Sequence, residues 1–126
     1  MPENEQQEIG DINFAQSLIK LSLESLKPME GNTIEITSLT SNQSFKAQID
    51  EVVIGKTEGK RWESFVIYLD VCPKQDVVLT QGYYRVNFNE LGIYDLFSSP
   101  NSETELEFCF NFDKKLRAEE KALKTS

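Results

Sequence analysis

The chain is organised around residues 79–97, which read Leu-Thr-Gln-Gly-Tyr-Tyr-Arg-Val-Asn-Phe-Asn-Glu-Leu-Gly-Ile-Tyr-Asp-Leu-Phe. This stretch is the densest run of aromatic and strand-forming residues, and two glycines punctuate it. Its alternation of side chains predicts a β-hairpin whose turn lies at residues 89–92. The face expected to point into the core carries Tyr84, Val86 and Phe88, with Tyr94 and Leu96 beside them on the returning strand.

Outside the hairpin, four segments alternate apolar and polar residues with the period of two that is typical of half-buried strands. They are residues 33–39, 45–54, 61–70 and 103–112. In the second segment the apolar parity switches to Val52 and Ile54, which predicts a β-bulge. The sequence Ser-Ser-Pro-Asn-Ser at 98–102 predicts a loop. Short strands at this spacing predict a mainly β fold, a small antiparallel barrel or sandwich of about six to seven strands.

The N-terminal end differs from this β-rich middle. Residues 1–11 carry four acidic and no basic side chains, without periodicity, which predicts a disordered acidic segment. Apolar residues then follow helical spacing over residues 12–26, which predicts a short N-terminal helix with a break near Ser22. The β-rich part is expected to form a single domain over residues 12–112.

The C-terminal end is a charged tail. Residues 113–126 include five basic and three acidic side chains, a composition that permits a helix capped by Asp113. Few apolar side chains are available to dock this helix on the domain, among them Leu116, Ala118 and Leu123. The mixture of charges is typical of a solvated helix face rather than of a nucleic-acid contact.

Composition excludes several classes of function. The net charge is −8, which opposes phosphate binding, so no nucleic-acid partner is expected. No apolar run is long enough to cross a bilayer, and the acidic start lacks the features of a secretion signal. We therefore expect a cytoplasmic protein that makes no membrane contact.

The chain contains no histidine, the side chain most used for acid–base catalysis near neutral pH and the commonest transition-metal ligand. Cys72 and Cys109 are far apart in sequence and make no metal-binding framework. They are expected to be half-buried thiols, and a single bridge between them stays open as an alternative. We expect no cofactor.

Two stretches together resemble a family of small bacterial domains of unknown function. The first, Ser64-Phe65-Val66-Ile67-Tyr68-Leu69, is similar to the family strand F-x-L-x-F, and residues 79–92 are similar to its L-P-Q-G-x-Y-x-L-x-H-x-x-L-G motif. The resemblance covers about residues 21–112. It implies an all-β fold and an association with phage-tail-like proteins, and it implies no reaction. Thr80 stands in place of the family's proline, and Phe88 in place of its histidine.

The acidic residues offer two further hypotheses. Glu103, Glu105 and Glu107 share one strand face and could bind a hard cation, although such carboxylates usually keep an exposed strand soluble. Asp50-Glu51 and Asp70 would have to converge in a cleft to act as acid and base. Solvated side chains are the more economical interpretation of both sets, so we expect no metal and no enzyme.

The outward face of the hairpin is the best candidate for a contact surface. Tyr83, Arg85 and Asn87 share this face, and Trp62 is a further aromatic candidate on the strand at 61–70. Tyrosine, tryptophan and arginine are enriched at protein interfaces. The sequence therefore favours a non-enzymatic domain with a protein-interaction role or a structural and accessory role. Such a domain would belong to a phage-tail-like or other multiprotein assembly. It would bind a protein partner or associate with itself. The alternative is a β-barrel carrier of a small ligand.

Overall fold

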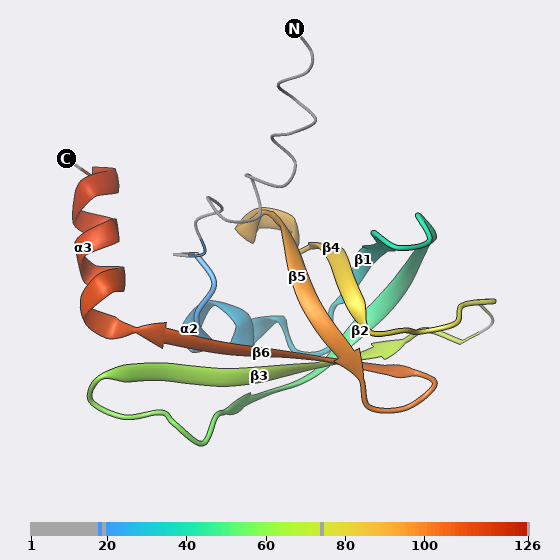
Figure 1. Ribbon diagram of the computed structural model, residues 1–126, viewed down its shortest axis with the longest axis horizontal. Helices are drawn as coiled ribbons and strands as arrows, with labels where there is room; N and C mark the ends of the chain where they lie inside the picture. The colour runs from blue at the N-terminus through green and yellow to red at the C-terminus, as the bar shows by residue number, and fades with distance from the viewer. Residues whose placement is uncertain (1–17, 19, 74, 126) are drawn as a thin grey trace, which may run out of the picture.

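The computed structural model describes residues 18, 20–73 and 75–125. Six antiparallel strands form a closed barrel in the order β1-β2-β3-β6-β5-β4, and β1 pairs with β4 to complete the circle (Figure 1). Of the two predicted architectures, the barrel is therefore the correct one. The strands are β1 (Thr33–Ser38), β2 (Ser44–Ile54), β3 (Trp62–Val71), β4 (Gly82–Asn87), β5 (Ile93–Pro100) and β6 (Glu105–Asp113).

The predicted hairpin is formed by β4 and β5, with a short 3-10 turn, η2 (Asn89–Leu91), between them. Tyr84 lies opposite Leu96, and Val86 lies opposite Tyr94. The side chains expected to be core are indeed buried, since none of Tyr84, Val86 and Phe88 is more than 2% exposed. Local alternation therefore placed this element and its inward face correctly.

Aromatic rings fill the interior of the barrel. Phe65 of β3 stacks on Phe110 of β6 with ring centroids 4.8 Å apart. Tyr84 of β4 lies edge-on between Phe45 of β2 and Phe108 of β6. Large rings from four strands meet in this way because all of them occupy inward positions of the pleat.

The predicted bulge is present in β2. The register of β2 against β3 shifts between Ile49 and Glu51, and Val52 is fully buried after the shift. The prediction was wrong for Ile54, which is 62% exposed. Ile54 is the last residue of β2, where the strand reaches the turn to β3, so core contacts no longer decide its environment.

The segment predicted as a loop at 98–102 begins inside a strand. Ser98 to Pro100 belong to β5, and the loop follows them. Ser98 is buried, and its hydroxyl donates to the carbonyl of Glu107 at 2.7 Å. The next strand begins at Glu105 rather than at residue 103. Pairing with a distant strand overrode the local turn signal, because Ser99 and Pro100 close the barrel against β6.

A short helical unit covers one end of the barrel. It consists of α2 (Leu23–Leu26) and η1 (Lys27–Met29). Ser22 caps α2: its hydroxyl accepts from the amide of Ser25, and the hydroxyl of Ser25 accepts from the amide of Ser22. Leu21 and Leu26 are fully buried beneath the unit.

The helix is shorter than the one predicted over 12–26, because Leu18 and residues 20–22 precede it without helical structure. Residues 12–17 of that prediction, and the acidic segment 1–11, lie outside the described residues. In the part of the chain that the structure describes, no helix is long and apolar enough to span a bilayer.

The charged tail forms α3 (Lys114–Thr125), which leaves the end of β6 and projects from the barrel (Figure 1). Leu116 and Leu123 do not dock it, since they are 62% and 77% exposed. Arg117, by contrast, is buried and reaches back to the domain. The helix was predicted, but its attachment to the domain through Arg117 was not. An arginine side chain is expected to be exposed to solvent unless the fold surrounds it with hydrogen-bond acceptors.

Candidate interaction surface

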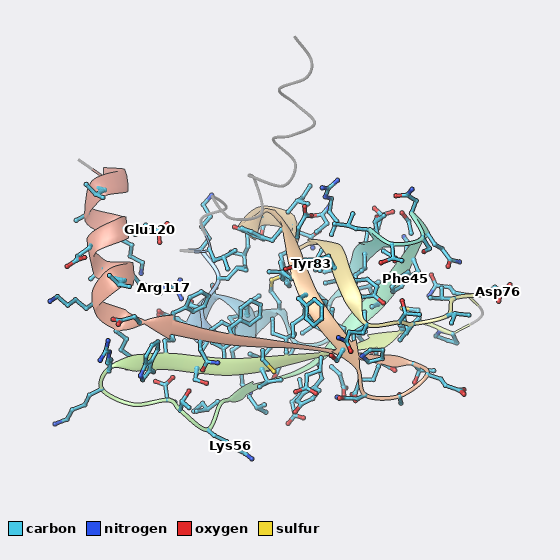
Figure 2. The ribbon with its side chains drawn as sticks, in the orientation of Figure 1. Phe45, Lys56, Asp76, Tyr83, Arg117 and Glu120 are labelled. Atoms are coloured by element: carbon cyan, nitrogen blue, oxygen red, sulfur yellow. The ribbon has the colours of Figure 1, made fainter. Side chains whose placement is uncertain are left out.

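The outer side of the β4–β5 hairpin carries three cross-strand pairs. They are Tyr83 with Phe97, Arg85 with Asp95, and Asn87 with Ile93. These six side chains are called the hairpin face below, and Tyr83 is labelled in Figure 2. Three of them are the predicted candidates Tyr83, Arg85 and Asn87, which the structure brings together as expected from their shared parity.

The aromatic pair is half-exposed. The rings of Tyr83 and Phe97 meet edge to face with centroids 5.4 Å apart, an arrangement that ring quadrupoles favour. The two residues are 48% and 49% exposed, and Ile93 on the same face is 57% exposed. The hairpin therefore presents several apolar side chains to its surroundings on one rigid, hydrogen-bonded element.

The charged pair beside these rings is well ordered. Arg85 donates from Nε to Oδ1 of Asp95 at 2.7 Å and from Nη2 to Oδ2 at 2.9 Å. The Asp95 side chain is 4% exposed, whereas that of Arg85 is 48% exposed. The hydrogen bonds from Arg85 to Asp95, together with the attraction of its charge, raise the pKa of Arg85 against the opposing effect of burial. The geometry presents a fixed guanidinium next to the aromatic pair.

Asn87 stabilises the turn at the other end of the hairpin face. Its side-chain carbonyl accepts from the amide of Asn89 at 2.8 Å. Asn89 has a positive φ of 59°, in the left-handed region that asparagine tolerates better than most residues. Asn87 therefore stabilises the turn, and the side chains of the hairpin face that are available for contact with a partner are Tyr83, Arg85, Ile93 and Phe97.

Trp62 lies on a different side of the molecule. It begins β3, opposite Asp113 of β6, and β3 is three strands away from β4 in either direction around the barrel. The guanidinium of Arg61 lies 5.3 Å from the centre of its ring. The structure thus separates Trp62 from the other three predicted contact residues, which sequence parity within single strands could not show.

The acidic candidates are spread over several elements. Glu105 and Glu107 are on β6, while Glu103 lies in the preceding loop. Asp70 is opposite Gln48, and the register shift falls between Ile49 and Glu51. Among the described residues, no group of three or more side chains could hold a metal ion.

Both cysteines are free thiols, and the prediction that both are half-buried holds only for Cys72, since Cys109 is exposed. Although Cys109 is exposed, partial desolvation of its thiol raises the pKa of Cys109, and so does the hydrogen bond that the thiol donates to the carboxylate of Glu107 at 3.3 Å. A raised pKa lowers the thiolate fraction at neutral pH, so Cys109 is a weak nucleophile.

Sequence reasoning missed Asp95, Ile93 and Phe97 as parts of the hairpin face. The signal for them was present. Tyr94 and Leu96 were expected to point inward, so their odd-numbered neighbours had to point outward. Their pairing with Tyr83, Arg85 and Asn87 depends on the hairpin register, which the turn type sets.

The fold and this surface define a small closed β-barrel domain with an aromatic and arginine-bearing hairpin on its outside. Residues 21–110 match the model of a family described as a domain of unknown function, DUF6916. The chain belongs to this family. The matched range runs from two residues before α2 into β6, so it contains the hairpin face and excludes α3. No curated protein and no solved structure matches the chain.

Proposed function

We propose that this chain is a non-enzymatic protein-binding domain that serves as a structural or accessory part of a multiprotein assembly. The observation that carries the proposal is the half-exposed Tyr83–Phe97 pair beside the ordered guanidinium of Arg85. Aromatic and arginine side chains supply most hot spots of protein interfaces.

The hairpin face is also held in a fixed conformation. Its residues lie on paired strands, and β1 flanks them, with Thr37 opposite Arg85. Binding through such a surface orders few additional side chains, so little conformational entropy is lost on association. A flat, preorganised face of this kind suits a protein surface better than a small molecule.

One observation favours binding over catalysis. The chain has no histidine, the side chain most used for acid–base catalysis near neutral pH. The packing of Phe65, Tyr84 and Phe108 inside the barrel also counts against a ligand carrier, because these rings take the space that a cargo would need.

The partner is proposed to be a protein rather than a nucleic acid or a membrane, in keeping with the net charge of −8. We further propose a cytoplasmic location. The bacterial and phage-tail-like setting is what the sequence resemblance implies, and it is part of this proposal.

The test compares the wild-type chain with the double variant Tyr83→Ser/Phe97→Ser in affinity purification from its source cells, with quantitative mass spectrometry. We expect a partner that is retained by the wild type and reduced at least about tenfold with the double variant, the loss that a hot spot of about 1.4 kcal/mol gives. Light scattering over a range of protein concentrations measures the molar mass in solution, which would increase if the partner were a second copy of the chain.

Trp62→Ser is the matched control, since it also removes an exposed aromatic side chain, on a different side of the barrel. Equal thermal midpoints of all variants would show that the barrel is intact. A monomer that retains no protein, or a partner retained equally by the double variant, would overturn the proposal.

A further inference from the structure

The strands β2, β3 and β6 are the three longest of the barrel, and they lie side by side with β3 in the middle. At about 3.3 Å per residue, β3 extends over about 30 Å. The outward side of these three strands, from Trp62 to Asp70 along β3, is called the long face below. The hairpin face lies on β4 and β5, so the long face is a second, separate surface of the molecule.

One end of the long face is acidic. Glu51 of β2 and Glu107 of β6 flank Tyr68 of β3, and Asp70 of β3 lies opposite Glu105 of β6. Partial desolvation raises the pKa of Tyr68, and so do the negative charges of the three glutamates around it. In the part of the chain that the structure describes, none of the four carboxylates forms an ion pair with a basic side chain. Their negative charges are therefore available to a second molecule.

The opposite end of the long face is basic. The turn from β2 to β3 lies there and carries Lys56, Lys60 and Arg61, which are all exposed, and Figure 2 shows Lys56 pointing out from this turn. Arg61 pairs with Asp113 at 3.1 Å. Among the described residues, Lys56 and Lys60 have no ion-pair partner. The two ends of the long face thus carry unpaired charges of opposite sign.

The middle of the long face is neutral and partly apolar. Val53 of β2 and Cys109 of β6 flank Val66 of β3, and this set of three residues is called the central row below. The two valines are half-buried, and the cysteine is exposed. Val66 is four residues from Trp62 and four from Asp70, so the central row lies midway between the basic end and the acidic end.

A surface with this order of charges is complementary to itself. A two-fold rotation about an axis through the central row brings the basic end of one copy onto the acidic end of another, and it brings the two central rows together. Two-fold contacts of this kind use the same patch on both subunits and close on themselves. A partner of a single charge sign would complement only one end of the long face, whereas a second copy complements both.

We propose that the long face is a self-association surface through which two copies of this chain form an antiparallel, two-fold dimer. The net charge of −8 opposes the approach of two copies, but at an ionic strength of 0.1 M this repulsion is screened beyond about 10 Å. The ion pairs between opposite ends form at shorter distances, so they decide the orientation of the two copies in contact.

The size of the long face sets the strength of this dimer. Three strands about 4.8 Å apart and about 30 Å long cover about 400 Å² on each copy, or about 800 Å² in total. Interfaces of this size belong to the weak and transient class. The dimer is therefore expected to be in rapid, reversible exchange with the monomer.

Sedimentation equilibrium of the full-length chain, from about 1 μM to about 1 mM, covers the range in which such a contact dissociates. We expect a monomer–dimer equilibrium for the wild type. The acidic-end variant Glu51→Lys/Glu107→Lys and the basic-end variant Lys56→Glu/Lys60→Glu should each dimerise at least about tenfold more weakly, because each places like charges opposite one another at both ends of the dimer. A monomeric wild type, or oligomers larger than a dimer, would overturn the proposal.

Mixing the two variants tests the orientation of the copies. In a mixed dimer the unchanged acidic end of one chain meets the unchanged basic end of the other, and at the opposite end the introduced lysines meet the introduced glutamates. An equimolar mixture should therefore dimerise at least about tenfold more strongly than either variant alone. A mixture that is as monomeric as its two components would contradict the antiparallel arrangement.

The matched control is Glu35→Lys/Glu90→Lys, which makes the same change in net charge as the acidic-end variant, at exposed positions of β1 and η2. It should dimerise as the wild type does, within about threefold. A loss as large as that of the acidic-end variant would show that net charge controls association. Tyr83→Ser/Phe97→Ser should also keep the dimer. Its loss in that variant would assign the second copy to the hairpin face, which removes the role of the long face and leaves the proposed function intact.

The exposed thiol of Cys109 reports where the two copies meet. Cys109 lies in the central row, so the two-fold axis brings it close to the same residue of the second copy. In chains that carry Cys72→Ser, a short bismaleimide should join two copies through Cys109 at least about tenfold faster than in the same chain with the acidic-end substitutions, because association raises the local thiol concentration. Mass spectrometry identifies the bridge. Equal cross-linking rates in the two chains would show that any dimer forms elsewhere on the molecule.

Discussion

At the scale of single residues, Arg117 joins parts of the chain that are distant in sequence. Its guanidinium donates to Oε1 of Glu63 at 3.1 Å and to the carbonyl of Leu21 at 2.8 Å, and it covers the ring of Phe112. Glu63 in turn accepts from the amide of Leu23 at the start of α2. One planar cation thus connects α3, β3, β6 and the N-terminal end of the described chain.

We expect Arg117→Lys to lower the free energy of unfolding by about 1–3 kcal/mol, because a lysine lacks the donor fork and leaves buried carbonyl groups unpaired. Urea unfolding followed by circular dichroism measures this change. Lys115→Ala, at an exposed position of the same helix, should alter stability by less than about 0.5 kcal/mol. Equal unfolding midpoints for Arg117→Lys and the wild type would show that the contacts of Arg117 carry no net stability.

At the scale of elements, the β4–β5 hairpin depends on its turn. Gly92 has a φ of 108°, and a Cβ atom at this position would lie 3.0 Å from the hydroxyl of Tyr94. That hydroxyl donates to the carbonyl of Leu91, so its position is constrained. The glycine is therefore required both by its backbone conformation and by the close approach of a side chain.

Gly92→Ala should destabilise the domain by about 1–3 kcal/mol, the usual size of left-handed strain at a non-glycine residue. The matched control is Gly59→Ala, because Gly59 is exposed and a Cβ there has only one neighbour within 4 Å, at 3.9 Å. The control should be neutral, or stabilising by up to about 1 kcal/mol through the unfolded chain. Similar thermal midpoints for the two variants would refute the role given to the turn.

At the scale of the whole molecule, the carboxylate of Glu30, the residue after η1, helps to attach the α2–η1 unit to the barrel wall. Oε2 of Glu30 accepts from the amide of Val52 at 2.7 Å and from Nζ of Lys27 at 2.9 Å. The hydrogen bond from Val52, followed by that from Lys27, lowers the pKa of Glu30. Protonation of this residue therefore weakens the contact between the helical unit and the bulged strand.

The sign of the pH effect follows from that lowered pKa. Stability from Glu30 is present above the ordinary glutamate pKa of about 4.3 and is lost as the pH falls through the lowered folded-state value. In thermal melts from pH 7 to pH 3, Glu30→Gln should be less stable than the wild type near neutrality, and the difference should vanish at the acid end. Glu24→Gln, at an exposed position of α2, should show no such trend, and a constant difference for Glu30→Gln would argue against this linkage.

The sequence by itself determined the local features. Alternation placed Tyr84, Val86 and Phe88 in the core and grouped Tyr83, Arg85 and Asn87 outside, because side-chain direction in a strand depends only on position along it. The parity switch at Val52 located the bulge for the same reason. The break predicted near Ser22 likewise falls at the N-cap of α2, since capping is a contact between residues three positions apart.

Only the tertiary structure decided what depends on pairing between distant segments. The choice of barrel over sandwich, the closing of Ser99 against Glu107 and the burial of Arg117 all result from contacts across long stretches of chain. The same contacts placed Trp62 away from the hairpin face. Strand order and register decide such features, because a period of two specifies a strand's faces and leaves its neighbours undetermined.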